Sequence, residues 1–311
     1  MASRKGYVSR AAIPPDVMAR LNAGQEEPQT LAEWLAVDWR QLLATVLGEL
    51  GLSAFQSPID RNLSPTGISS GHHRDSLRTL QSQNKSGDAT LGVMARQKAL
   101  GSAFFELVAG HADGLRIYEV LASHRSGIVR EWAALSWTAN PQLSIAERLD
   151  GARRFAADPS MGVREIAWSS YRPYLAVALD EALSLLETWV RDSDPNIRRC
   201  AIESTRPRGV WCSHLNALKA EPQRALPLLD VVRADHARYV QLSVANWLND
   251  ASKHQPAWVE QTTGRWLAES PCEPTRWIVN HALRTLRKAT NGADKSLAAS
   301  KTAATADGSA R

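Results

Sequence analysis

Residues 194–211 read DPNIRRCAIESTRPRGVW, and their pattern decides how the chain around them folds. Asp194-Pro195 predicts an N-cap followed by a proline at the first helical position, so a helix begins there. Arg206-Pro207 predicts its end near Thr205, because the residue before a proline disfavours the helical conformation. Small, mostly apolar residues recur at helical spacing and predict the face that packs: Ile197, Cys200, Ala201 and Ser204.

A second face of the same helix carries charge: Arg199, Glu203 and Arg206. Between Asn196 and Val210 the chain has four arginines and one acid, Glu203. A carboxylate among guanidinium groups stays ionised, because opposite charges within a few ångströms favour its charged form. From this helix alone, an ordinary surface ion pair of Arg199 with Glu203 is the favoured interpretation, and the repetition of the segment is what argues against it.

The segment belongs to a repeat with an interval of 34 residues. Val129-Arg130, Val163-Arg164 and Ile197-Arg198 each open an apolar helix, and Arg172-Pro173 precedes Arg206-Pro207 by the same interval. Two weaker copies of the dipeptide follow, at Val240-Gln241 and Ile278-Val279. Amphipathic runs lie between the copies, at residues 143–157, 177–190, 226–232 and 258–267. Two helices per repeat predict an all-α fold, an α-solenoid superhelix of HEAT-like helical repeats with one helix of each pair on a concave surface. The Trp-Leu-Gly-Tyr order of tetratricopeptide repeats is absent.

The remaining segments differ in composition, and we divide the chain accordingly. Residues 1–52 predict an N-terminal helical segment, with one helix after Pro14-Pro15 and another from Thr30 to about Leu50. Residues 53–87 are rich in Ser, Gly, Asn and Gln and predict a polar, mobile loop. The repeats occupy residues 88–288, and residues 289–311 predict a disordered tail.

Composition limits the class of protein. The chain has 311 residues, a formal net charge of +5 and a pI near 9.3, which weakly favours an anionic partner. Its three cysteines lack metal-ligand spacing, and adjacent His72-His73 do not face one site, so we expect reduced thiols and no metal. No signal-like segment or run of about 20 apolar residues occurs, so we expect a cytoplasmic monomer without contact to a membrane.

Three longer segments resemble the HEAT-like DNA alkylation repair glycosylases, the AlkC/AlkD group, and most of all its AlkC branch. They are RRCAIESTRPRGVW (198–211), LPLLDVVRADHARYVQLSVANWLNDASKHQP (226–256) and TRWIVNHALRTLRK (275–288). The resemblance covers residues 164–288 well and the N-terminal part loosely. It implies a superhelix that cradles duplex DNA, and excision of cationic N-alkylated bases without metal or cofactor. The candidate bases are 3-methyladenine, 3-methylcytosine and 7-methylguanine.

The chemistry of such a reaction requires carboxylates. A base alkylated at a ring nitrogen is already positively charged and leaves readily, so positive charge develops on the sugar, where a fixed carboxylate stabilises it. At an effective dielectric of about 20 and a separation of about 4 Å, one such charge pair contributes about 4 kcal/mol, or about a thousandfold in rate. A carboxylate can also position the attacking water. Two acids match the family's motifs: Glu203 and Asp250.

Asp250 lies at helical spacing with Asn246, Asn249 and Lys253, a stripe that is either a solvated face or, given the resemblance, part of a DNA-facing site. Arginine and lysine bind phosphates, and tryptophan stacks on sugars or bases, although a tryptophan at helical spacing is more often core. The candidate DNA contacts are Arg164, Arg172, Arg198, Arg206, Arg208, Trp211, Asn246, Trp247, Asn249 and Lys253.

One position departs from the AlkC pattern. Four residues before the first Arg-Pro, where the family has a glutamate, this chain has Trp168, and Glu165 lies one turn away as a replacement. Trp168 shares its helix face with Tyr171 and Arg172, which predicts an indole that faces the groove and stabilises a cation through its π face. The third candidate catalytic residue is therefore Trp168, unless its ring packs in the core.

Three hypotheses follow. The first is a DNA glycosylase of base excision repair, a hydrolase that removes cationic alkylated bases from an open groove without full flipping of the base. The second is a solenoid that binds damaged or branched DNA without catalysis. The third is a protein-interaction scaffold, which predicts no salt-dependent DNA binding.

Overall fold

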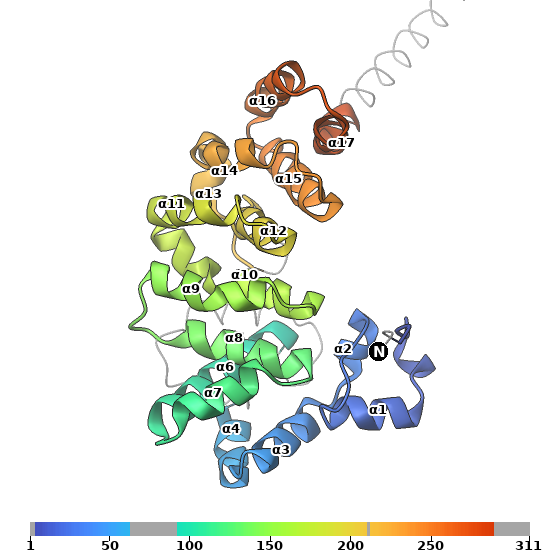
Figure 1. The fold of residues 1–311 in the computed structure, drawn as a ribbon, viewed down its shortest axis with the longest axis vertical. Coiled ribbons are helices and arrows are strands. Elements are labelled where there is room, and N and C mark those ends of the chain that lie inside the picture. Colours follow the sequence, from blue (N-terminus) through green and yellow to red (C-terminus); the bar gives the residue numbers. More distant parts are fainter. Residues whose placement is uncertain (1–3, 63–91, 210–211, 289–311) are drawn as a thin grey trace, which may run out of the picture. The chain divides into compact units, whose positions relative to one another are not determined.

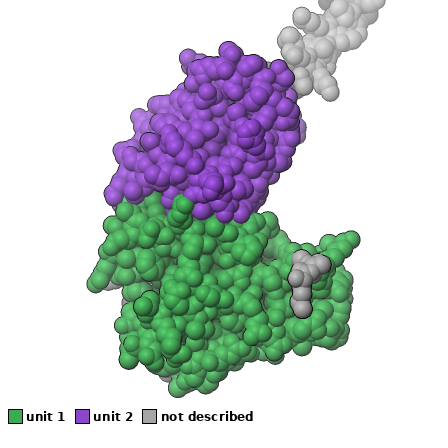
Figure 2. All heavy atoms as spheres, viewed as in Figure 1, with its two compact units in different colours: residues 1–171 green, residues 172–311 purple. Residues whose placement is uncertain are grey.

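The computed structural model describes residues 4–62, 92–209 and 212–288. Every element in these ranges is a helix, and no strand occurs among them. The predicted all-α fold of helical repeats is therefore confirmed. The chain divides into two compact units, residues 1–171 (unit 1) and residues 172–311 (unit 2), which Figure 2 shows in green and purple.

Unit 1 begins with short helices and continues with longer ones that pack on their neighbours (Figure 1). The helix α8 contacts α6, α7 and α9 and buries Trp132 against Phe104. The elements are η1 (Arg10–Ala12), α1 (Pro15–Asn22), α2 (Leu31–Ala36), α3 (Trp39–Glu49), η2 (Ser53–Phe55), α4 (Gln56–Asn62), α6 (Val93–Gly110), α7 (Gly114–Ala122), α8 (Gly127–Ala139) and α9 (Ile145–Ala156), followed by α10 (Met161–Val177), which runs into unit 2.

Two expectations for this unit need correction. The single helix expected from Thr30 to Leu50 is two helices, because the Asp38 side chain accepts hydrogen bonds from the amides of Arg40 and Gln41 and so starts a new helix. Residues 53–62, expected to be loop, form η2 and α4. The rest of that predicted loop, with His72-His73, and the predicted disordered tail lie outside the described residues.

Unit 2 contains the helix that the sequence predicts after Asp194-Pro195. Its α12 starts as predicted, with the Asp194 carboxylate accepting from the Asn196 amide at 2.8 Å, and it ends at Ser204. Within the unit α12 contacts α15, α15 contacts α17, and α11 contacts both α12 and α14, as stacked helical pairs do. The elements are α11 (Leu179–Trp189), α12 (Pro195–Ser204), α13 (Asn216–Ala220), η4 (Pro222–Ala225), α14 (Leu226–Val231), α15 (Arg238–Ala251), α16 (Pro256–Glu269) and α17 (Glu273–Ala282).

The arginines of the 34-residue repeat have one shared function within the fold. Nη1 of Arg130, Arg164 and Arg198 donates in each case to the carbonyls six and five residues earlier, at 2.6–3.1 Å. Arg130 and Arg198 also form two-point ion pairs with Asp158 and Asp235, respectively. These half-buried guanidinium groups hold the turns between repeats, and the binding of DNA phosphates by Arg164 and Arg198 stays a prediction.

No described helix is long and apolar enough to cross a membrane.

Candidate functional site

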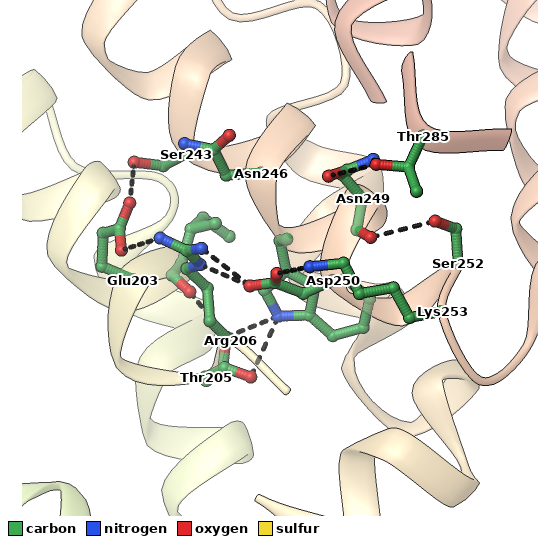
Figure 3. A network of polar contacts seen from close by, with 12 residues as sticks. Glu203, Thr205, Arg206, Ser243, Asn246, Asn249, Asp250, Ser252, Lys253 and Thr285 are labelled. Carbon is green, nitrogen blue, oxygen red and sulfur yellow. Dashed lines mark hydrogen bonds and ion pairs between the residues drawn. The ribbon is translucent and has the colours of Figure 1, made fainter. Parts of the chain in front are cut away.

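Glu203 and Asp250 stand 47 positions apart in the sequence, yet one guanidinium group joins them (Figure 3). Nη1 of Arg206 lies 3.1 Å from Oε2 of Glu203, while its Nε and Nη2 lie 2.9 and 2.7 Å from Oδ2 of Asp250. Glu203 is in the last turn of α12, Arg206 follows that helix, and Asp250 is near the end of α15. The two acids named from the sequence therefore belong to one cluster, and α12 and α15 position it.

Both carboxylates are nearly inaccessible, at 5% exposure each. Burial opposes the charge of Arg206, but the carboxylates of Glu203 and Asp250 more than offset it and raise the pKa of Arg206 above its usual value. Arg199 Nη2 lies 3.7 Å from Glu203 Oε1, and Lys253 Nζ lies 3.4 Å from Asp250 Oδ1. Two acids are thus surrounded by three cations, all within unit 2.

The four carboxylate oxygens differ in how well they are held. Glu203 Oε1 accepts from Ser243 Oγ at 2.7 Å, and its Oε2 accepts from Arg206. Asp250 Oδ2 accepts two bonds from Arg206, whereas the one contact of Oδ1 with a described residue is the long one with Lys253. Asp250 Oδ1 is therefore the oxygen whose present partner is most easily exchanged for another cation.

Two participants were missed in the sequence. Ser243 lies seven residues before Asp250, on the same helical stripe as Asn246, and that spacing was the signal available. Arg284 comes from beyond α17 and donates to Asn246 Oδ1 at 2.8 Å. Burial lowers the pKa of Arg284, with an opposing effect of Asp250 and a further lowering by Arg206, so this guanidinium lies within electrostatic reach of the acid cluster. Nothing in the local sequence indicates that reach.

Three predicted DNA contacts prove to be parts of the core. Arg172 is 2% exposed, and its guanidinium donates to the carbonyls of Ser204 and Arg206 at 2.5 and 2.6 Å. Trp247 is fully buried, with Nε1 donating to the carbonyl of Thr205 at 3.0 Å. Asn249 is also buried and donates to the carbonyl of Ala282. These predictions are wrong because all three side chains satisfy backbone carbonyls at the ends of neighbouring helices.

Trp168, the third candidate catalytic residue, lies in unit 1. Its ring is 8% exposed, and Nε1 donates to Glu165 Oε2 at 2.9 Å. Tyr171, on the same face of α10, is fully buried. The expected indole that faces an open groove is therefore corrected to a buried ring bonded to a carboxylate.

The other predicted DNA contacts differ in exposure and in their bonding partners. Lys253 is exposed, and Arg208 is half-buried and forms no hydrogen bond or ion pair with any described residue. Trp211 lies outside the described residues. No group of three or more His, Cys, Asp or Glu side chains in the described part of the chain has the geometry of a metal site.

Comparison with known proteins gives a family match over the segment that contains the acid cluster. Residues 162–286, which include the whole acid cluster, match the family of DNA alkylation repair enzymes. The chain is 38% identical over 117 residues to the uncharacterized protein YhaZ of Bacillus subtilis (strain 168), a match that covers 38% of this chain and 32% of YhaZ.

Solved structures show the same likeness. The alkylpurine DNA glycosylase AlkC of Pseudomonas fluorescens, bound to DNA containing an abasic site analog, has 27% identity and a TM-score of 0.55 and covers 74% of this chain and 63% of AlkC. AlkD2 from Streptococcus mutans has 18% identity and a TM-score of 0.46, over 74% of this chain and 97% of AlkD2. The chain thus spans about a third of YhaZ and less than two thirds of AlkC. The resemblance inferred from the sequence is confirmed.

Proposed function

We propose, from the membership of residues 162–286 in the DNA alkylation repair enzyme family, that this chain is a DNA glycosylase that removes cationic N-alkylated bases from duplex DNA. The observation that carries the proposal is the joining of Glu203 and Asp250 through Arg206 inside the matched segment. Candidate bases are 3-methyladenine, 3-methylcytosine and 7-methylguanine, whose fixed positive charge makes them good leaving groups.

The geometry supplies what the departing base requires. When the bond between base and sugar breaks, its electron pair goes to the cationic base, which leaves neutral, and the positive charge moves to the sugar. Buried carboxylates held by Arg206 and Ser243 are already oriented and need little reorganisation to stabilise that charge. We assign the direct contact to Asp250 through Oδ1, with Glu203 adding negative charge beside it. Water then attacks the sugar, and a carboxylate can accept its proton.

The remaining features of the proposal follow from the chain's charge and chemistry. A net charge of +5 and the exposed Lys253 favour a polyanionic substrate. Because the charged lesion is already a good leaving group, we propose that the protein needs no metal or cofactor. We also propose that it acts as a cytoplasmic monomer and that the base stays in or near the stack. Selectivity then comes from the charge of the lesion, so a neutral base such as uracil is not a substrate.

The test is single-turnover base release from duplexes that contain each of the three methylated bases, with a uracil duplex as comparison. We expect release above the spontaneous rate for at least one methylated base and none for uracil. Asp250→Asn is expected to slow release by about a hundred- to a thousandfold and Glu203→Gln by tens-fold or more. Asp180→Asn is the matched control, since that carboxylate is 82% exposed and pairs with Arg224.

The outcomes separate the three hypotheses. Salt-dependent DNA binding without release of any base would replace the glycosylase with a binding protein. Absence of both release and salt-dependent binding would leave the protein-interaction scaffold. Normal release by both acid variants would remove Glu203 and Asp250 from the chemistry.

A further inference from the structure

Five basic side chains gather beside the acid cluster in unit 2: Arg208, His214, Lys219, Lys253 and His254. We call them the His214 cluster. They come from the connection between α12 and α13, from α13 itself and from the residues after α15. His214, Lys253 and His254 are exposed, and Arg208 and Lys219 are half-buried, so the cluster is accessible from solvent.

The central contact of the cluster joins two basic groups. Lys219 Nζ lies 3.1 Å from Nδ1 of His214 and 3.1 Å from Oδ1 of Asn216. An ammonium group has only donors, so this hydrogen bond requires that Nδ1 of His214 carries no proton. Among the described residues, no carboxylate lies within ion-pair distance of Lys219 or Arg208. The charges of Lys219 and Arg208 therefore have no carboxylate partner among the described residues, unlike the charge of Arg206.

The pKa values of His214 and His254 show the same excess of positive over negative charge around them. Burial, then Lys219, Arg208 and Arg172, lower the pKa of His214 below its usual value, and only Asp250 opposes them. Burial, Lys219, Arg208 and Lys253 lower the pKa of His254. Like charges that repel one another at a solvent-accessible place are stabilised when an anion binds among them.

We infer that the His214 cluster binds a backbone phosphodiester of DNA and takes up a proton on His214 when it does so. The inference rests on the proposed function for the identity of the anion. A phosphodiester accepts hydrogen bonds from Lys219 and Arg208, and it also favours the imidazolium form of His214, in which both ring nitrogens are donors. Asp250 is among the charges that act on His214, so the proposed phosphate site lies in unit 2 beside the acid cluster.

The proton linkage has a definite sign. The phosphate raises the pKa of His214 from its low value in the free protein, so binding is strongest when the pH is below the free value. The gain falls as the pH rises from the pKa of His214 in the free protein to its pKa in the complex, and it is lost at higher pH. One proton taken up gives a decrease in affinity of at most about tenfold per pH unit.

The experiment measures binding of an undamaged duplex between pH 5.5 and 8.5 at constant ionic strength. We expect the affinity of the wild type to fall with pH, and His214→Gln to remove most of that slope. Lys219→Gln is expected to weaken binding and to lower the slope of log affinity against log salt by about one. His236→Gln and Arg276→Gln, at exposed positions of unit 2, are the matched controls and leave both slopes unchanged.

A second measurement follows the ring signals of His214 by NMR as the pH is varied, with no ligand, with the duplex and with inorganic phosphate. A pKa raised by the duplex supports the inference. If inorganic phosphate raises the pKa of His214 and the duplex does not, the cluster is a site for a free anion. If neither ligand changes this pKa, the cluster binds no phosphate. Either result overturns the inference. Undamaged DNA is used, so absence of base release leaves this test intact, and base release without proton-linked binding defeats only this inference.

Discussion

One buried carboxylate of unit 1, that of Glu131, and the two buried carboxylates of the acid cluster in unit 2 have opposite electrostatic surroundings. In unit 1, Glu131 of α8 is 1% exposed and accepts from Trp34 Nε1 at 2.8 Å and from Gln97 Nε2 at 3.3 Å. No cation of the described chain forms an ion pair with it, and burial raises the pKa of Glu131 to about 8. In unit 2, Glu203 and Asp250 are as deeply placed but are bonded to Arg206.

The two sites share one position of the 34-residue repeat. Glu131 and Arg199 stand 68 residues apart, two intervals of 34, so they occupy the same position in the pattern. Where unit 1 has an acid that neutral donors hold, unit 2 has a guanidinium that stacks on Tyr239 and lies 3.7 Å from Glu203. The helical framework thus accommodates either an acid or a guanidinium group at this position. In unit 2 the guanidinium at this position lies beside the buried carboxylate of Glu203. In unit 1 the residue at this position is itself the buried acid, and it forms no ion pair with a described cation.

The largest expected effect comes from removal of the cation that the unit 2 acids share. Arg206→Met leaves two buried carboxylates without their main partner, so we expect a loss of about 3–5 kcal/mol in the free energy of unfolding. Urea unfolding measures it. Arg224→Met is the control, because its partner Asp180 is largely exposed and such a pair contributes less than about 1 kcal/mol. Equal, small losses in both variants would mean that solvent reaches the acids of unit 2.

The next effect tests the acid of unit 1. The folded state raises the pKa of Glu131 above its value in the unfolded chain, so its contribution is fully present below the unfolded pKa and is lost as the pH rises toward about 8. Glu131→Gln keeps an acceptor for Trp34 without a titrating group. Its stability relative to wild type is expected to grow between about pH 4.5 and 8, by on the order of 2–4 kcal/mol, and then to level off.

Thermal or urea unfolding at several pH values checks this expectation. Glu106→Gln, at an exposed position of α6, is the matched control and has no pH-dependent advantage. A constant difference between Glu131→Gln and wild type across the range would show that Glu131 is ionised at neutral pH, like an acid paired with an arginine.

The smallest effect concerns Trp168, in α10 near the end of unit 1. Trp168→Phe retains most of the buried ring and removes the hydrogen bond to Glu165, so we expect a loss of about 1 kcal/mol in stability and base release within about twofold of wild type. Release assays and urea unfolding on the same preparation separate the two quantities. A tenfold loss of release with an intact fold would return the indole to the catalytic site.

The sequence was most informative where local physics acts. The cap at Asp194-Pro195 and the apolar face of α12 were predictable, because capping and helical spacing involve residues within one or two turns. The acids Glu203 and Asp250 were named from motifs, and the structure brings them together. The depth of the side chains around them was not predictable. Arg172 and Asn249 look like solvated polar residues in a helical pattern, yet neighbouring repeats cover them.

The sequence by itself determined that this chain is a stack of helical pairs with a period near 34 residues, in which two acids stand close to arginines. Only the tertiary structure decided which arginines are available. Arg130, Arg164 and Arg198 hold turns, Arg172 holds helix ends and Arg206 holds the acids. The physical reason is that a guanidinium reaches well beyond its own helical turn. Its partners are therefore backbone carbonyls and carboxylates that packing, and not spacing along the chain, brings within reach.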